Sequence, residues 1–190
     1  MDLNTSSHAE LVARLDSAVS ELRDAAAREL YRRGRADAEQ AITPWRANPE
    51  IGELISNHAT VGIAVTRERF ARIRALLGQP RLAEVPPDQD AEEFEWSPDA
   101  GTHLDILTTR APGKDGAISK FLTKFGEGIQ QVEFLTRDID EATRLLASRL
   151  NVTPIYPATR AGADGTRVNF FLANATEGRK VLVELVETKR

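Results

Sequence analysis

An internal repeat constrains the fold of this chain more than any other feature of its sequence. The stretch ATVGIAV has the apolar composition of a buried strand and leads into a helical segment, RERFARIRALLG. The same order returns later, where IQQVEFLT precedes DIDEATRLLASRL. About three further strands are expected in each copy, with THLDILTT closing the first and VTPIY, TRVNFFLA and KVLVELVE closing the second. The sequence therefore predicts an α+β domain over residues 56–188, built from two βαβββ copies at about 57–110 and 128–188.

The first 50 residues form a separate extension and linker. Residues 6–43 are expected to be helical, because Ser7 and Glu10 match a capping box and an apolar residue recurs every three or four positions. This stripe consists of Leu11, Leu15, Val19, Leu22, Ala26 and Leu30. Pro44 and Pro49 are expected to end the helix. The stripe either packs on the following domain or pairs with a second chain, and a homodimer is the expected assembly.

Composition excludes several classes of site. The chain has no cysteine, which rules out disulfides, thiol nucleophiles and zinc–thiolate centres. Its net charge of −4 argues against nucleic-acid binding, which usually requires a basic surface. No apolar run approaches the roughly 20 residues of a membrane span, and the N-terminus has no signal-peptide pattern. We expect a cytoplasmic protein whose partner is a small molecule.

Four stretches carry a resemblance to a known family: TVGIAV, AISKFLTKFGEGI, VEFLTRDIDEA and VLVELVE. Together they resemble the vicinal oxygen chelate superfamily, which includes glyoxalases, bleomycin resistance proteins and extradiol dioxygenases, and within it the methylmalonyl-CoA epimerases. The resemblance covers about residues 57–188. It implies that the two copies form a half-open, U-shaped mixed sheet whose concave side holds a divalent metal.

Carried over position by position, the resemblance places the family's four metal ligands on Thr60, Asp105, Gln131 and Glu184. The two positions that hold histidine in the family carry Thr60 and Gln131 here. Because His58 precedes Thr60 by two residues on the same strand, it is a candidate for a displaced ligand. A site made of Asp105, Gln131, Glu184 and His58 would suit Mg, Mn or Fe(II), and the alternative is that no metal binds.

Carboxylates in apolar strands point to the same region without reference to the family. Glu184 lies within VLVELV, and Asp105 occupies the matching place in THLDIL. Glu133 follows Gln131 by two residues and should face the same side. A carboxylate among strand valines is unfavourable unless it is paired, metal-bound or protonated. We therefore expect Glu184, Asp105 and Glu133 to act as acid, base or ligand; the alternative is that they are solvated or hydrogen-bonded to Gln131 or Thr60.

Four further residues are candidates for binding a substrate. Phe94 and Trp96 share one face of a strand, where they either form an aromatic wall for a ligand or pack in the core. The resemblance also implies a catalytic base on a middle strand of the first copy, at Phe94 or at a glutamate beside it. A shift of one residue in the alignment would move this position to the other face of the strand, so the base is not assigned. Arg160 and Arg167 lie in a glycine-containing loop, where they either meet an anionic group or are solvated.

These observations favour a small-molecule enzyme: an epimerase, isomerase or lyase that works next to a carbonyl group, with a degenerate or absent metal site. The expected ligand carries a carbonyl or carboxylate. The alternatives are a metal-free protein that binds and sequesters a small molecule, and an interaction protein with a vestigial cleft.

Overall fold

The computed structural model describes residues 5–113, 115–175 and 178–188. Its elements in chain order are α1 (His8–Arg14), α2 (Ser20–Ala47), α3 (Pro49–Gly52), β1 (Ile55–Ala64), α4 (Arg67–Leu76), β2 (Glu92–Asp99), β3 (Thr102–Thr108), α5 (Ala117–Phe125), β4 (Gly128–Thr136), α6 (Ile139–Leu150), β5 (Arg160–Ala161), the 3-10 helix η2 (Ala163–Gly165), β6 (Arg167–Asn174) and β7 (Lys180–Glu187). The chain divides into two compact units. Unit 1 comprises Met1–Arg33 and Thr60–Gln130, and unit 2 comprises Gly34–Ala59 and Gln131–Arg190.

The strands pair in the order β2-β3-β1-β4-β7-β6-β5 in one seven-stranded sheet. The duplication is visible in the pairing, because the first strand of each copy is parallel to its last strand: β1 pairs with β3, and β4 pairs with β7. The remaining pairs, β2 with β3, β6 with β7 and β5 with β6, are antiparallel. The predicted fold class, an α+β protein with a duplicated repeat, a mixed sheet and an N-terminal helix, is confirmed. Among the described residues, no helix has the length and apolar character needed to span a membrane.

Unit 1 has apolar packing on both faces of its strands. On one face, Phe94 of β2 meets Phe70 of α4 edge to face, with ring centroids 5.0 Å apart. On the other face, Ile118 of α5 belongs to a buried cluster with Ala64 and Leu107. Helix α4 begins at Thr66, whose side chain accepts a hydrogen bond from the backbone of Arg69, as an N-cap does.

The N-terminal residues are an integral part of unit 1. The expected capping box between Ser7 and Glu10 is present at the start of α1. The carboxylate of Asp16 accepts ion pairs from Arg69 at 3.0 Å and from Arg72 at 2.8 Å, which joins the α1–α2 connection to α4. The apolar residues of this part that are fully buried are Leu11, Val12, Leu15, Ala26, Ala27 and Leu30. In unit 1 the extension therefore packs against its own chain.

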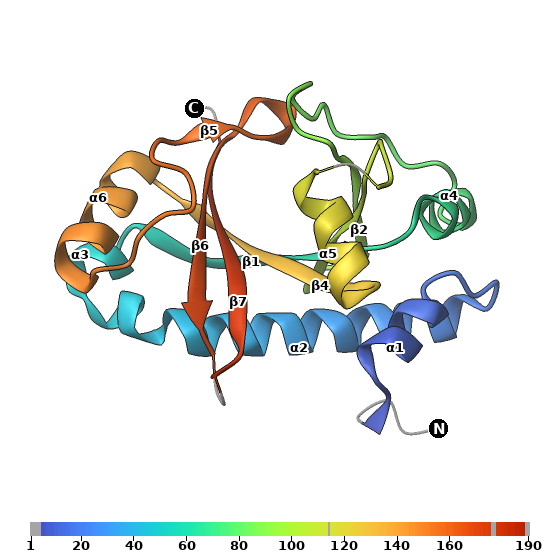
Figure 1. Cartoon of the computed structure of the whole chain (residues 1–190). Helices are drawn as coiled ribbons and strands as arrows, with labels where there is room; N and C mark the ends of the chain where they lie inside the picture. Colours follow the sequence, from blue (N-terminus) through green and yellow to red (C-terminus); the bar gives the residue numbers. More distant parts are fainter. Residues whose placement is uncertain (1–4, 114, 176–177, 189–190) are drawn as a thin grey trace. The chain divides into compact units, whose positions relative to one another are not determined.

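Unit 2 is built on the long antiparallel ribbon of β6 and β7 (Figure 1). Its core includes Trp45 of α2, which is 2% exposed and packs edge to face on Phe171 of β6 at 5.5 Å. The guanidinium of Arg46 lies 5.4 Å from the ring centre of Phe134 on β4. Helix α6 begins at Asp138, whose side chain accepts from the backbone of Glu141, so the predicted N-cap is confirmed.

Several predicted boundaries were wrong. The helix expected over residues 6–43 is interrupted between α1 and α2, which leaves Val19 and Leu22 half exposed. Helix α2 also continues through Pro44 to Ala47, because burial of Trp45 holds its last turn in place.

Strand assignments also differ from expectation. Two strands rather than about three follow α4 in the first copy, since the intervening segment contains Pro80, Pro86 and Pro87, which cannot donate ladder hydrogen bonds. The stretch VTPIY makes only an isolated bridge, between Pro154 and Phe171.

Candidate functional site

The polar residues of unit 2 lie in one transverse row across its strands. In register, Glu133 of β4 is opposite Glu184 of β7, and Glu184 is opposite Phe170 of β6. Residues opposite one another in a sheet share a face, so these three side chains lie side by side on the same face. Because side chains alternate along a strand, Gln131 belongs to this face as well.

Glu184 is enclosed by this arrangement. Its residue exposure is 7%, and the amide Nε2 of Gln131 donates a hydrogen bond to its carboxylate. Leu182 and Val186, two positions away on β7, are apolar neighbours on the same face. Two carboxylates opposite one another on adjacent strands repel, and burial of Glu184 adds to the cost of having both charged. An arrangement that is unfavourable for folding is a reason to expect a functional role.

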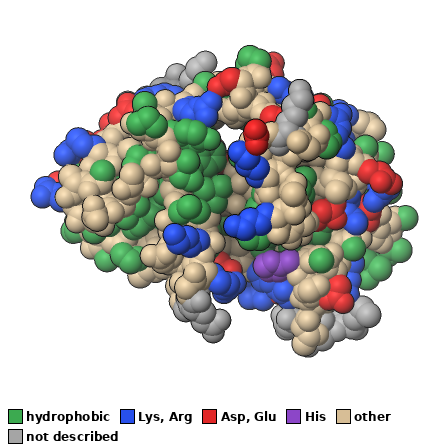
Figure 2. Space-filling view, viewed as in Figure 1, with side chains coloured by type: hydrophobic (Ala, Val, Ile, Leu, Met, Phe, Trp, Pro, Cys, Tyr) green, Lys and Arg blue, Asp and Glu red, His purple; other side chains and the backbone are tan. Residues whose placement is uncertain are grey.

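Exposed apolar side chains extend this face beyond the carboxylates. Leu172 of β6 is 53% exposed and shares the face of Phe170. The backbone of Ile155 donates to the carbonyl of Phe170 at 2.7 Å, and the Ile155 side chain is 46% exposed. Figure 2 shows hydrophobic side chains gathered over β6 and β7. Unit 2 therefore combines a buried carboxylate, Glu184, and a partly exposed one, Glu133, with an accessible apolar surface, which together suit a small organic acid derivative.

Unit 1 carries a corresponding row. Asp105 of β3 is opposite Gly62 of β1 and opposite Glu95 of β2. The β1–β3 pair of the first copy corresponds to the β4–β7 pair of the second. Asp105 on β3 therefore occupies the place of Glu184 on β7, and Thr60 on β1 occupies the place of Gln131 on β4. Glu95 was not among the predicted site residues, because the sequence leaves the register between β2 and β3 undetermined. The register places Glu95, and not Phe94, on the face of Asp105.

The other candidates of unit 1 differ in their surroundings. Phe94 is 1% exposed and packs on Phe70, so of its two alternatives the structure shows core packing. Trp96 is opposite Leu104 on the same face as Phe94 and is partly exposed. Thr60 is buried at 8% exposure. His58 is exposed on the part of β1 that belongs to unit 2.

The two predicted anion-binding arginines have partners within unit 2. Arg167 donates to Asp140 at 2.6 Å and lies 3.3 Å from Glu187, and its guanidinium holds the pKa of Asp140 below its usual value. Glu187 also accepts from the backbone of Ile139, so Arg167 ties β6 and β7 to the start of α6. The guanidinium of Arg160 lies 4.5 Å from the ring centre of Tyr156. Both arginines thus make structural contacts.

The donor set does not match a divalent-metal site. In unit 2, the two ligand positions carried over from the family are bonded to each other, with the Gln131 amide donating to Glu184. A metal at this place would need lone pairs of both side chains directed at one point. Across the part of the chain that the structure describes, no three His, Asp or Glu side chains are grouped so that they could hold a metal ion. We therefore derive no chemistry from a metal.

Comparison with known proteins gives a consistent family assignment. The chain is 30% identical to methylmalonyl-CoA epimerase from Mycobacterium tuberculosis, with a TM-score of 0.56 over 72% of this chain and 89% of that one. A Streptomyces coelicolor methylmalonyl-CoA epimerase variant in complex with 2-nitronate-propionyl-CoA is 27% identical, with a TM-score of 0.55 over 70% of this chain and 95% of that one.

A further methylmalonyl-CoA epimerase structure, at 22% identity and a TM-score of 0.57 over 72% of this chain and 98% of that one, supports the fold alone. No protein-family model matches the chain, and no curated protein matches it. The duplicated strand pairing and the 30% identity to a methylmalonyl-CoA epimerase lead to one assignment. This chain belongs to the vicinal oxygen chelate superfamily.

Proposed function

We propose that this protein catalyses proton transfer at the carbon next to the carbonyl group of an acyl-coenzyme A thioester, as an epimerase, an isomerase or a lyase. The observation that carries the proposal is the buried carboxylate of Glu184, held by the Gln131 amide and lying opposite Glu133. Solved relatives named as methylmalonyl-CoA epimerases, one of them in complex with methylmalonyl-CoA, support a CoA thioester as the substrate class.

Glu184 has the properties of a general base in this scheme. A carboxylate within reach of the α-carbon of a bound thioester can remove its proton as a general base. Hydrogen bonding to Gln131 fixes the orientation of the carboxylate, so it is positioned before the substrate arrives. Glu133 is the candidate for the acid that returns a proton or stabilises the enolate oxygen.

The apolar surface beside the carboxyl pair suits the acyl part of the substrate. Phe170 is adjacent to Glu184 in register, and Leu172 and Ile155 add exposed apolar surface on the same side. Contact with these side chains would hold the acyl chain while its α-carbon lies at the carboxylates.

The test is exchange of the α-proton with solvent. Methylmalonyl-CoA and other 2-substituted acyl-CoA compounds are incubated with the protein in D2O, and loss of the α-proton signal is followed by NMR. We expect Glu184→Gln to slow exchange by about 100-fold or more. Glu50→Gln, which removes an exposed carboxylate of the same unit, serves as the matched control. Exchange at an unchanged rate in Glu184→Gln would reject the proposal.

A second candidate is a binding protein that performs no chemistry. The bond between Gln131 and Glu184 favours it, because the two family ligand positions are engaged with each other. Tight binding of an acyl-CoA that retains its α-proton throughout a long incubation would support this alternative.

A further inference from the structure

The face of unit 2 that carries Glu184 is apolar along the neighbouring positions. Glu184 is opposite Phe170 of β6, and the next pair on the same face is Leu172 of β6 opposite Leu182 of β7. Leu172 is 53% exposed, and Phe170 and Leu182 are partly exposed. The backbone of Ile155 donates to the carbonyl of Phe170, and the Ile155 side chain is 46% exposed. Large apolar side chains therefore lie beside a buried carboxylate and remain accessible.

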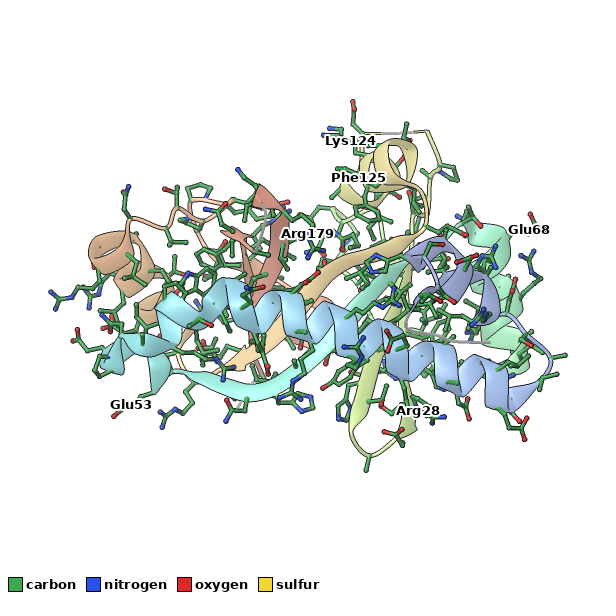
Figure 3. All side chains as sticks on the ribbon, turned by 90° about the horizontal axis from the view of Figure 1, so that it is seen from below. Arg28, Glu53, Glu68, Lys124, Phe125 and Arg179 are labelled. Carbon is green, nitrogen blue, oxygen red and sulfur yellow. The ribbon has the colours of Figure 1, made fainter. Side chains whose placement is uncertain are left out.

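The ribbon that bears this surface is held to α2. Trp45 of α2 packs on Phe171, whose side chain points away from that of Phe170 because side chains alternate along β6. Arg179, labelled in Figure 3, precedes β7 and pairs with Asp37 of α2 at 3.0 Å. Two contacts with one helix therefore fix β6 and β7, so that the apolar surface is formed before a ligand arrives.

The charge beside this surface disfavours an acidic acyl group. Glu184 and Glu133 lie opposite each other, and a third carboxylate next to them would add to their repulsion. Two arginines near the start of β6 already have partners: Arg167 pairs with Asp140 at 2.6 Å, and the guanidinium of Arg160 lies over an aromatic ring. An uncharged hydrocarbon group avoids the repulsion and gains free energy by covering the apolar side chains.

We propose that the acyl group of the substrate is an uncharged, 2-methyl-branched hydrocarbon chain that extends from the α-carbon along Leu172 and Ile155. The inference rests on the proposed function and names its substrate class. The methyl branch makes the α-carbon of such a chain a stereocentre, which proton transfer inverts. Leu172 and Ile155 then determine specificity, while Glu184 and Glu133 transfer the proton.

Two other occupants would use the same surface. A dicarboxylic acyl group would need a cation, and Arg160 is the candidate, because it stacks on Tyr156, whose ring lies 6.0 Å from that of Phe170. A second copy of the chain would bury Leu172 in a dimer. The hydrocarbon chain fits better than either, because it matches both the apolar side chains and the negative charge beside them.

The test measures affinity by calorimetry, and α-proton exchange by NMR, for compounds from 2-methylpropanoyl-CoA to 2-methylhexanoyl-CoA, with methylmalonyl-CoA for comparison. We expect affinity to rise about threefold for each CH2 group added. Leu172→Ser and Ile155→Ser should each lower affinity for 2-methylhexanoyl-CoA about fivefold and change that for 2-methylpropanoyl-CoA less than about twofold. Leu22→Ser, which alters a similarly exposed leucine of unit 1, is the matched control and should leave the series unchanged.

The outcomes separate this inference from the proposed function. Affinity that rises with chain length and falls in Leu172→Ser supports the apolar site, even if no compound exchanges its α-proton and the proposed function fails. Faster exchange of methylmalonyl-CoA than of 2-methylhexanoyl-CoA would overturn the inference and leave the proposed function intact; slowing of that exchange by Arg160→Met would then identify the dicarboxylic alternative.

Two further results would also overturn the inference. One is an affinity that does not depend on chain length. The other is a dimer that Leu172→Ser dissociates in analytical ultracentrifugation, because this leucine would then contact a second copy of the chain.

Discussion

Acidification should destabilise this protein through Glu29 of α2. Its carboxylate is bound by Arg32 at 2.7 Å and by Arg33 at 2.6 Å, and its side chain is only 9% exposed. Hydrogen bonding from Arg32, opposed by desolvation and reinforced by Arg33, lowers the pKa of Glu29 from 4.5 to about 2. Since the pKa in the folded state is below the unfolded value, the stabilisation is complete above about pH 4.5 and is lost as pH falls toward about 2.

The magnitude follows from this displacement. Without solvent screening, the lowered pKa of Glu29 would contribute about 3 kcal/mol to the free energy of unfolding at neutral pH. Because Arg32 is exposed to water, we expect a contribution of about 2 kcal/mol. Urea unfolding of wild type and Glu29→Gln is compared between about pH 7 and pH 2. The difference in free energy of unfolding should be largest near neutral pH and shrink steadily below about pH 4.5. Glu141→Gln, which breaks an exposed pair with Arg144, should have a much smaller effect. A difference that does not change with pH would refute the reasoning.

Two further predictions concern unit 2. Trp45→Ala removes a buried ring that packs on Phe171 and should lower the free energy of unfolding by about 3–5 kcal/mol; a loss below about 1 kcal/mol in urea unfolding would show that α2 contributes little to this unit. Arg167→Ala breaks the contacts to Asp140 and Glu187 and should cost about 1 kcal/mol of stability in the same assay. Because Arg167 has structural partners, affinity for coenzyme A in Arg167→Ala should remain that of wild type; a large loss would restore it as an anion-binding residue.

Sequence reasoning succeeded where the signal is local. The alternation of VLVELVE predicts β7 over the residues that form it, and Asp138 caps α6 as expected. Helix α5 was not among the predicted elements, because it lies between the two copies predicted at about 57–110 and 128–188. The spacing of Ile118, Phe121, Leu122 and Phe125 is that of an amphipathic helix and was available in the sequence.

The site depends on register, which the sequence does not specify. Alternation predicts that Gln131 and Glu133 share a face, but only pairing of β4 with β7 places Glu133 opposite Glu184. In the sequence analysis, a hydrogen bond from Glu184 to Gln131 or Thr60 belonged to the alternative to an acid, base or ligand role; the structure shows the bond to Gln131. Glu95 was one of the glutamates beside Phe94 that the sequence could not assign to a face, and the pairing of β2 with β3 places it on the face of Asp105.

The central claim is that a buried carboxylate of unit 2 removes a proton from carbon. The most direct measurement is the deuterium content of an acyl-CoA recovered after incubation in D2O with wild type, Glu184→Gln and Gln131→Ala. We predict full labelling by wild type. Gln131→Ala should label more slowly, because the Glu184 carboxylate loses the hydrogen bond that orients it. Glu184→Gln should give almost no labelling, because the substitution removes the base. Equal labelling by all three proteins would contradict the account.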